Sequence, residues 1–145
     1  MHAPRRPPGG ASGRAPVGDA LGRRVAAGVV PGPTSEAVTG GWIRLPEGRV
    51  VDPLVAAAIT DAWLPPLFSR LVRESVAVPT LDLTVHFRSA LPLPAARPDD
   101  WVLCVFRSKV AAEGFVEEDG EVWSREGVLL AQSRQLAAMV PFRSR

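Results

Sequence analysis

A single carboxylate stands near the end of an apolar stretch, AAAITDAW at residues 56–63. If this stretch is helical, Asp61 shares a face with Leu54, Ala57 and Ala58, which precede it by seven, four and three residues. An ionised carboxylate on a buried face needs hydrogen-bond donors or an opening to a cleft, because burial of an isolated charge is costly. Asp61 is therefore either a functional group at a cleft or a solvated residue at an exposed helix end, and the pattern alone leaves both open.

A second candidate is an amide in a row of small and apolar side chains. Strand alternation in LLAQSRQLAA places Gln135 on one face with Ala131, Ser133 and Ala137. An amide in this row either donates and accepts hydrogen bonds at a site or is an ordinary glutamine at the rim of a sheet. Thr80 is the first residue of the alternating segment at residues 80–88. It carries no functional signal by itself, because threonine is common in strands.

The other reactive side chains are few. His86 lies on the polar face of its segment, where we expect a solvated or hydrogen-bonded histidine. Cys104 is the single cysteine, so no internal disulfide can form, and we expect a buried thiol in a protein of the reducing cytoplasm. Two histidines and one cysteine do not make a plausible metal set, and no glycine-rich phosphate loop or serine nucleophile elbow occurs. We therefore expect no metal and no cofactor.

The helix that carries Asp61 has clear start and stop signals. Asp52 can cap its first turn, and Pro53 fits the first helical position, whose amide needs no partner. We expect the helix to run over residues 53–63, until Pro65 and Pro66 break it. It is apolar nearly all round, which predicts burial on most of its sides.

The other elements read as strands. A short strand is expected at residues 41–46, and an alternating strand at residues 80–88 puts Leu81 on one face and Thr80 and Asp82 on the other. A further strand begins near Trp101, apolar on both faces as a central strand would be. Two long strands follow, and we favour a hairpin turn at REG, residues 125–127, over the rival pair Asp119-Gly120.

Composition divides the chain into two parts. Residues 1–38 form a leader whose first 35 residues hold six prolines, seven glycines and a net charge of +4, which predicts disorder or a linker. Residues 39–145 form the folded body, which then carries a mildly acidic charge and argues against nucleic-acid binding. No apolar run approaches the ~18 residues of a membrane span. One strand, a buried helix and four antiparallel strands predict an α+β hotdog fold, in which the sheet wraps the helix.

Four segments carry a resemblance to a known family: GGWIRLP, DPLVAAAITDAWLPP, PTLDLTVHFR and GVLLAQSRQLAAMVP. In their order along residues 40–142 they resemble the second half of the type II acyl-CoA thioesterases, a double-hotdog family. The resemblance implies a single hotdog that corresponds to the C-terminal half. The chain departs from the family pattern in two respects. Leu83 stands where the family commonly has a histidine after the LD pair, and the first hotdog of the pair is missing.

The resemblance also implies a site and a reaction. The family's aspartate, threonine or serine, and glutamine fall on Asp61, Thr80 and Gln135, which would hold the water that hydrolyses acyl-CoA to fatty acid and CoA. Asp61 would help to deprotonate this water, and the other two residues would fix its position. Apolar walls that include Trp63 and Leu64 would accept the acyl chain.

Other interpretations remain open at this stage. The chain would have to form a homodimer or pair with a second hotdog half, because the family's acyl pocket lies at the seam between two hotdogs. A non-catalytic hotdog that binds acyl groups or assists assembly, or a truncated inactive half, is the alternative. A hydratase on the same fold is disfavoured, because no histidine occurs between Asp61 and His86.

Overall fold

The computed structural model describes residues 37–45, 48–70 and 76–142. The leader predicted over residues 1–38 therefore lies almost wholly outside the described residues. The elements are β1 (Ala37–Ile43), α1 (Pro53–Ile59), η1 (Pro66–Ser69), β2 (Val76–Ala77), β3 (Thr80–Phe87), β4 (Val102–Ser108), β5 (Ala111–Ala112), β6 (Phe115–Trp123), β7 (Leu129–Ala138) and β8 (Val140–Pro141). None of the helices within these ranges is long and apolar enough to cross a membrane.

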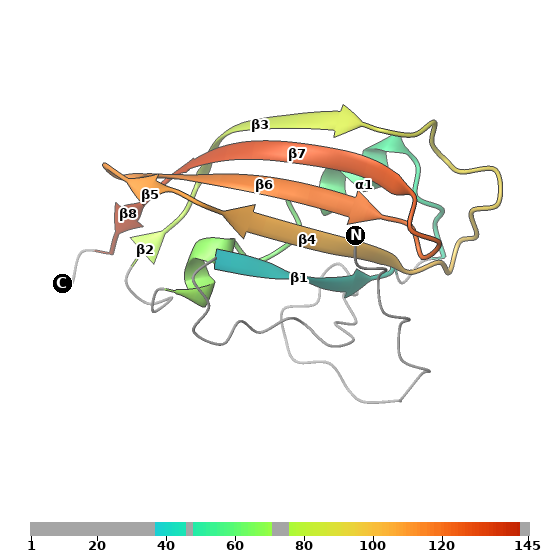
Figure 1. Cartoon of the computed structure of the whole chain (residues 1–145), viewed down its shortest axis with the longest axis horizontal. Coiled ribbons are helices and arrows are strands. Elements are labelled where there is room, and N and C mark those ends of the chain that lie inside the picture. Colours follow the sequence, from blue (N-terminus) through green and yellow to red (C-terminus); the bar gives the residue numbers. More distant parts are fainter. Residues whose placement is uncertain (1–36, 46–47, 71–75, 143–145) are drawn as a thin grey trace.

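A curved antiparallel sheet forms the body, with the order β1-β4-β6-β7-β3 and with β5 beside β6 (Figure 1). The β6–β7 hairpin turns at residues 125–127, where Gly127 has a φ of 86°, so the predicted REG turn is confirmed and Asp119-Gly120 lies inside β6. β4 is an interior strand, as its apolar start predicted. β3 is an edge strand, and β2 and β8 form a separate two-stranded pair.

The helix α1 lies against one face of this sheet, which we call the inner face (Figure 1). Its start is as predicted, because the Asp52 carboxylate accepts a hydrogen bond from the amide of Val55. This helix is shorter than predicted: it ends at Ile59, and Thr60 caps it with its amide bonded to the preceding turn. The prediction of burial on most sides was wrong, since Val55, Ala56 and Ile59 are buried but Leu54 is 74% exposed.

The core lies between α1 and the inner face. Its largest fully buried side chains include Phe106 and Ile43, and Val55 and Ile59 of the helix pack into the same cluster. Gly120 of β6 leaves the space that the Phe106 ring fills, because a Cβ at that position would lie 2.8 Å from the ring. The buried inward residues of β4, β6 and β7 thus pack against the helix and against one another.

The edge strand β3 has an irregular register at its start. Its pairing with β7 shifts between Thr80 and Asp82, where a β-bulge accommodates Leu81. Beyond the bulge, Leu83 pairs with Gln135 in regular antiparallel register. An antiparallel sheet that curves around one central helix is the arrangement of a hotdog fold, so the predicted fold class is confirmed.

Candidate functional site

The three residues predicted to hold water lie together at one end of the inner face. Gln135 donates from Nε2 to Oδ1 of Asp61 at 3.4 Å and also to Oγ1 of Thr80. Gln135 is buried, whereas Asp61 and Thr80 are exposed. The amide therefore links two oxygen-bearing side chains that come from segments far apart in the sequence.

The position of Asp61 follows from the early end of α1. Because the helix stops at Ile59, Asp61 belongs to the turn that follows, with its amide bonded to the carbonyl of Ala58 at 3.3 Å. The helix face expected to be buried is in fact exposed at Leu54 and Ala58, so Asp61 lies at an exposed helix end, one of the two alternatives that the sequence left open. Asp61 is an exposed residue at the helix end, yet it faces the buried amide of Gln135 rather than solvent alone.

The position of Thr80 follows from the bulge in β3. Simple alternation predicted Thr80 on the polar face with Asp82, but the bulge places it opposite Ala137, whose side chain is buried on the inner face. One extra residue in the strand changes the face of every residue before it. The threonine hydroxyl consequently reaches Gln135, two residues before Ala137 on β7.

A fourth polar residue at this end was not predicted. Glu118 of β6 pairs directly with Gln135 across the β6–β7 ladder, so the two side chains are neighbours on the inner face. Burial raises the pKa of Glu118 from 4.5 to about 8, with further contributions from the charges of Asp61 and Glu117. Glu118 is therefore mostly a neutral carboxylic acid at pH 7. The adjacent glutamates in the sequence gave no indication of which one faces inward.

Ser108 at the end of β4 adds a hydroxyl to this region. The β4–β6 ladder pairs Arg107 with Asp119, so continuing its register by one residue places Ser108 beside Glu118. Ser108 is 8% exposed, and its Oγ has no hydrogen-bond partner among the described residues. A buried hydroxyl without a partner is costly. This part of the inner face is therefore polar, between the main core and a smaller apolar cluster of Leu67, Val116 and Ala137.

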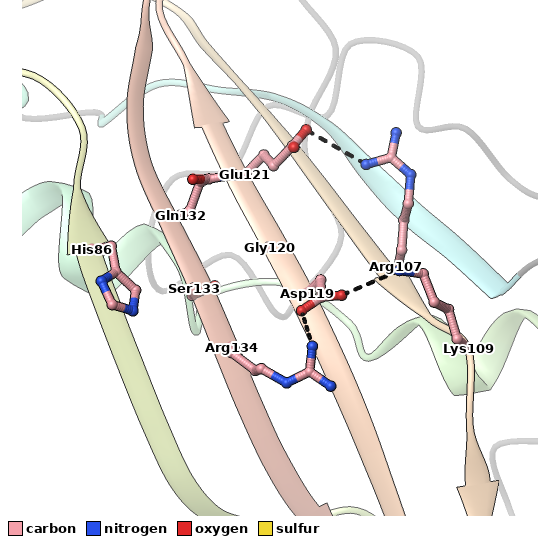
Figure 2. A pocket seen from close by; sticks show the side chains of 9 residues that line it. All are labelled: His86, Arg107, Lys109, Asp119, Gly120, Glu121, Gln132, Ser133 and Arg134. Carbon is pink, nitrogen blue, oxygen red and sulfur yellow. Dashed lines mark hydrogen bonds and ion pairs between the residues drawn. The ribbon is translucent and has the colours of Figure 1, made fainter.

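A shallow hollow of about 370 Å³ lies on the opposite, outer face of the sheet (Figure 2). Its charged residues pair with one another: Arg134 with Asp119 at 2.8 Å, and Arg107 with Glu121 at 3.5 Å. His86, predicted to be on the polar face, lines this hollow. Paired, exposed charges of this kind are typical of a solvated sheet face, and none of the three predicted residues borders it.

The residues predicted as an acyl wall have structural contacts of their own. Trp63 is partly buried and packs against the core cluster, and the carbonyl of Leu64 accepts a hydrogen bond from Oγ1 of Thr39 at 2.8 Å. This bond holds the segment after α1 against β1. Their contact with an acyl chain stays a prediction.

Cys104 is fully buried as a free thiol, and burial raises its pKa. In the parts of the chain that the structure describes, no group of three or more potential metal ligands gathers. The candidate chemistry therefore lies with carboxyl, hydroxyl and amide groups.

Comparison with known proteins places the chain in a family context. The family model described as the acyl-CoA thioesterase C-terminal domain matches residues 2–139. This match begins well before β1, and the division at residues 38 and 39 stays a prediction. No curated protein gave a significant match.

Three solved structures are similar to the chain. A hotdog-fold protein of unknown function from Alicyclobacillus acidocaldarius has a TM-score of 0.69 and 23% identity, covering 100% of this chain and 59% of that protein. A thioesterase II, described as putative, from Thermobifida fusca has a TM-score of 0.55 and 30% identity over 73% of this chain and 38% of its own. An acyl-CoA thioesterase II from Mycobacterium marinum has a TM-score of 0.56 and 22% identity over 77% and 44%. The chain thus spans about two fifths to three fifths of the length of these proteins.

Proposed function

Because the chain belongs to the acyl-CoA thioesterase C-terminal domain family, we propose that it takes part in the hydrolysis of an acyl-CoA to a fatty acid and CoA. The observation that carries this proposal is the contact of Gln135 with both Asp61 and Thr80. These are the three residues that the family resemblance selects, and the fold brings them together from a helix end, a bulged edge strand and the strand beside it.

The mechanism uses a water molecule and no covalent acyl-enzyme. Asp61 accepts a proton from the water as the water attacks the thioester carbonyl. Gln135 holds the Asp61 carboxylate and the Thr80 hydroxyl at fixed positions, so that both can bind the same water. Orientation of this kind lowers the barrier, because the entropy of arranging the reactants is lost on binding rather than in the reaction.

The site lies at an open edge of the sheet. Asp61 and Thr80 are exposed, and Leu81 and Phe87 of the edge strand β3 are 56% and 49% exposed. Apolar side chains beside an unpaired strand edge favour association with another sheet. We therefore propose a second hotdog, from another copy or from a separate chain, as the partner that completes the acyl pocket beside Trp63 and Leu64.

The first test is thiol release from short, medium and long acyl-CoAs, measured under reducing conditions. These conditions match the cytoplasm, which is the location we propose. Asp61→Asn keeps the size of the side chain and removes its charge, so we expect a loss of at least about tenfold in kcat/KM, or ~1.4 kcal/mol. Asp82→Asn is the matched control, because Asp82 lies past the bulge and pairs with exposed Leu136 on the outer side.

The outcomes separate the proposed enzyme from the alternative. Loss in Asp61→Asn with an unchanged Asp82→Asn supports a hydrolase. Light scattering determines whether the folded protein is a monomer or a dimer. If neither form releases thiol from any acyl-CoA, the proposal is contradicted, and the chain is a non-catalytic hotdog half that binds acyl groups or assists assembly. The second outcome is a real alternative, because the chain spans only 59% and 38% of the related proteins from Alicyclobacillus acidocaldarius and Thermobifida fusca.

A further inference from the structure

We propose that Glu118 is the general acid of this site, the group that protonates the sulfur of the departing CoA. The inference rests on the proposed thioester hydrolysis and assigns a role to a residue outside the Asp61, Thr80 and Gln135 group. It starts from position: Glu118 is paired across the ladder with Gln135, and Gln135 contacts Asp61.

The surroundings of Glu118 distinguish it from an ordinary surface carboxylate. On the inner face Glu118 is paired with the uncharged Gln135 of β7. Continuing the β4–β6 register by one residue places the hydroxyl of Ser108 on its other side. Within the described part of the chain, the charged groups that act on Glu118 are the carboxylates of Asp61, beyond the end of α1, and of Glu117, the preceding residue on β6. On the neighbouring strand β4, Arg107 lies in the outer-face hollow.

These neighbours keep Glu118 protonated at neutral pH, because burial and two negative charges both oppose its ionisation. Asp61, in contrast, is exposed and has the amide of Gln135 to bind its carboxylate. Two carboxyl groups in one site with such different environments are suited to opposite roles, one as base and one as acid. The hydroxyl of Ser108, buried and without a partner among the described residues, adds a hydrogen-bond donor on the same side of the sheet.

The proton balance of the reaction then closes within the site. Water attacks the thioester carbonyl carbon, and Asp61 takes one of its protons. The tetrahedral adduct collapses, the carbon–sulfur bond breaks, and the sulfur takes both bonding electrons and the proton of Glu118. Transfer of the proton from Asp61 to Glu118 restores both groups, so one water has been added and one acid and one thiol have left.

The test compares two leaving groups. Glu118→Gln keeps the size and neutrality of the side chain but cannot give up a proton to sulfur. On an acyl-CoA we expect its kcat/KM to fall by at least about tenfold, within the range of general acid catalysis. On the same acyl group carried by 4-nitrothiophenol, whose thiolate leaves without protonation, we expect a loss of less than about twofold.

Two controls exclude a purely structural effect. Glu121→Gln alters a carboxylate of the same strand that lies in the outer-face hollow, and we expect both rates to stay unchanged. The acyl-CoA rate of the wild-type protein should fall as the pH rises above about 8, where Glu118 loses its proton, and Glu118→Gln should lack this alkaline decline.

Each outcome bears on one proposal. An equal loss on both thioesters, or no loss on either, overturns the role of Glu118 while the hydrolase stands. If the wild-type protein hydrolyses neither thioester, the proposed function fails and the role of Glu118 fails with it.

Discussion

Glu117 and Glu118 are adjacent on β6, yet they point to opposite faces of the sheet and meet different surroundings. Glu117 accepts hydrogen bonds from the amides of Lys109 and Val110 and pairs with Arg134 at 3.6 Å. Glu118 lies beside Gln135, and among the residues that the structure describes no cation acts on its pKa. The charges of the outer face thus pair with one another, whereas the carboxyl groups of the inner site are the ones that we propose to transfer protons.

The largest effect is expected from Gln135, compared with Gln132 on the same strand as its control. Gln135→Ala removes the amide that joins Asp61 to Thr80, so we expect kcat/KM on an acyl-CoA to fall by about 10²-fold. Gln132→Ala, three residues earlier in the outer-face hollow, should stay within about twofold of wild type. Steady-state thiol release measures both, and equal losses would contradict the assignment of the chemistry to the inner face.

The adjacent glutamates should differ in how stability depends on pH. Between pH 4.5 and about 8 the folded state retains the proton of Glu118 that the unfolded chain has released, so wild-type stability falls as pH rises. Glu118→Gln removes this fall, at most about 1.4 kcal/mol per pH unit. Glu117→Gln should instead cost about 1 kcal/mol at pH 7 by weakening hydrogen bonds to two amides.

Urea unfolding from pH 5 to pH 9 checks this second prediction. The difference in stability between Glu118→Gln and wild type should grow with pH in favour of the variant. A constant difference across this range would mean that Glu118 titrates as an ordinary carboxylate.

The smallest effect is expected from the charges of the outer face. Arg134→Ala removes ion pairs with Asp119 and Glu117, but Arg134 is 63% exposed, so water and salt screen these pairs. We expect a loss of about 0.2–1 kcal/mol, smaller at high salt, and no change in thiol release. A loss of activity here would give the outer face a role that its paired charges do not indicate.

Sequence patterns predicted the hotdog fold, but only the family resemblance grouped Asp61, Thr80 and Gln135. Neither predicted the local geometry that brings these three residues into contact. Hydrophobic periodicity and the Asp52 cap located α1, but they could not show that Thr60 would end it before Asp61. Period-two alternation placed Gln135 correctly on the inner face and Thr80 incorrectly, because a bulge leaves no mark in the polar pattern.

The inward position of Glu118 could not be predicted either, because it depends on the register between β6 and β7. At the hairpin turn Trp123 pairs with Leu129, and a regular ladder from this pair would put Glu117 opposite Gln135. The irregularity between Val122 and Trp123 shifts the register by one residue, so Glu118 takes that place. Local propensity does not encode such a shift, since the packing of both sheet faces decides it.

The strand order has a consequence for how the chain folds during its synthesis. β1 pairs with β4, so Ala37 has no strand partner until Ser108 has been synthesised. Contacts between such distant residues close slowly, and until then Trp42 and Ile43 expose apolar surface. The nascent chain therefore passes through a long interval in which its first strand is vulnerable to aggregation and to chaperone capture, and it becomes protected only when the later strands emerge.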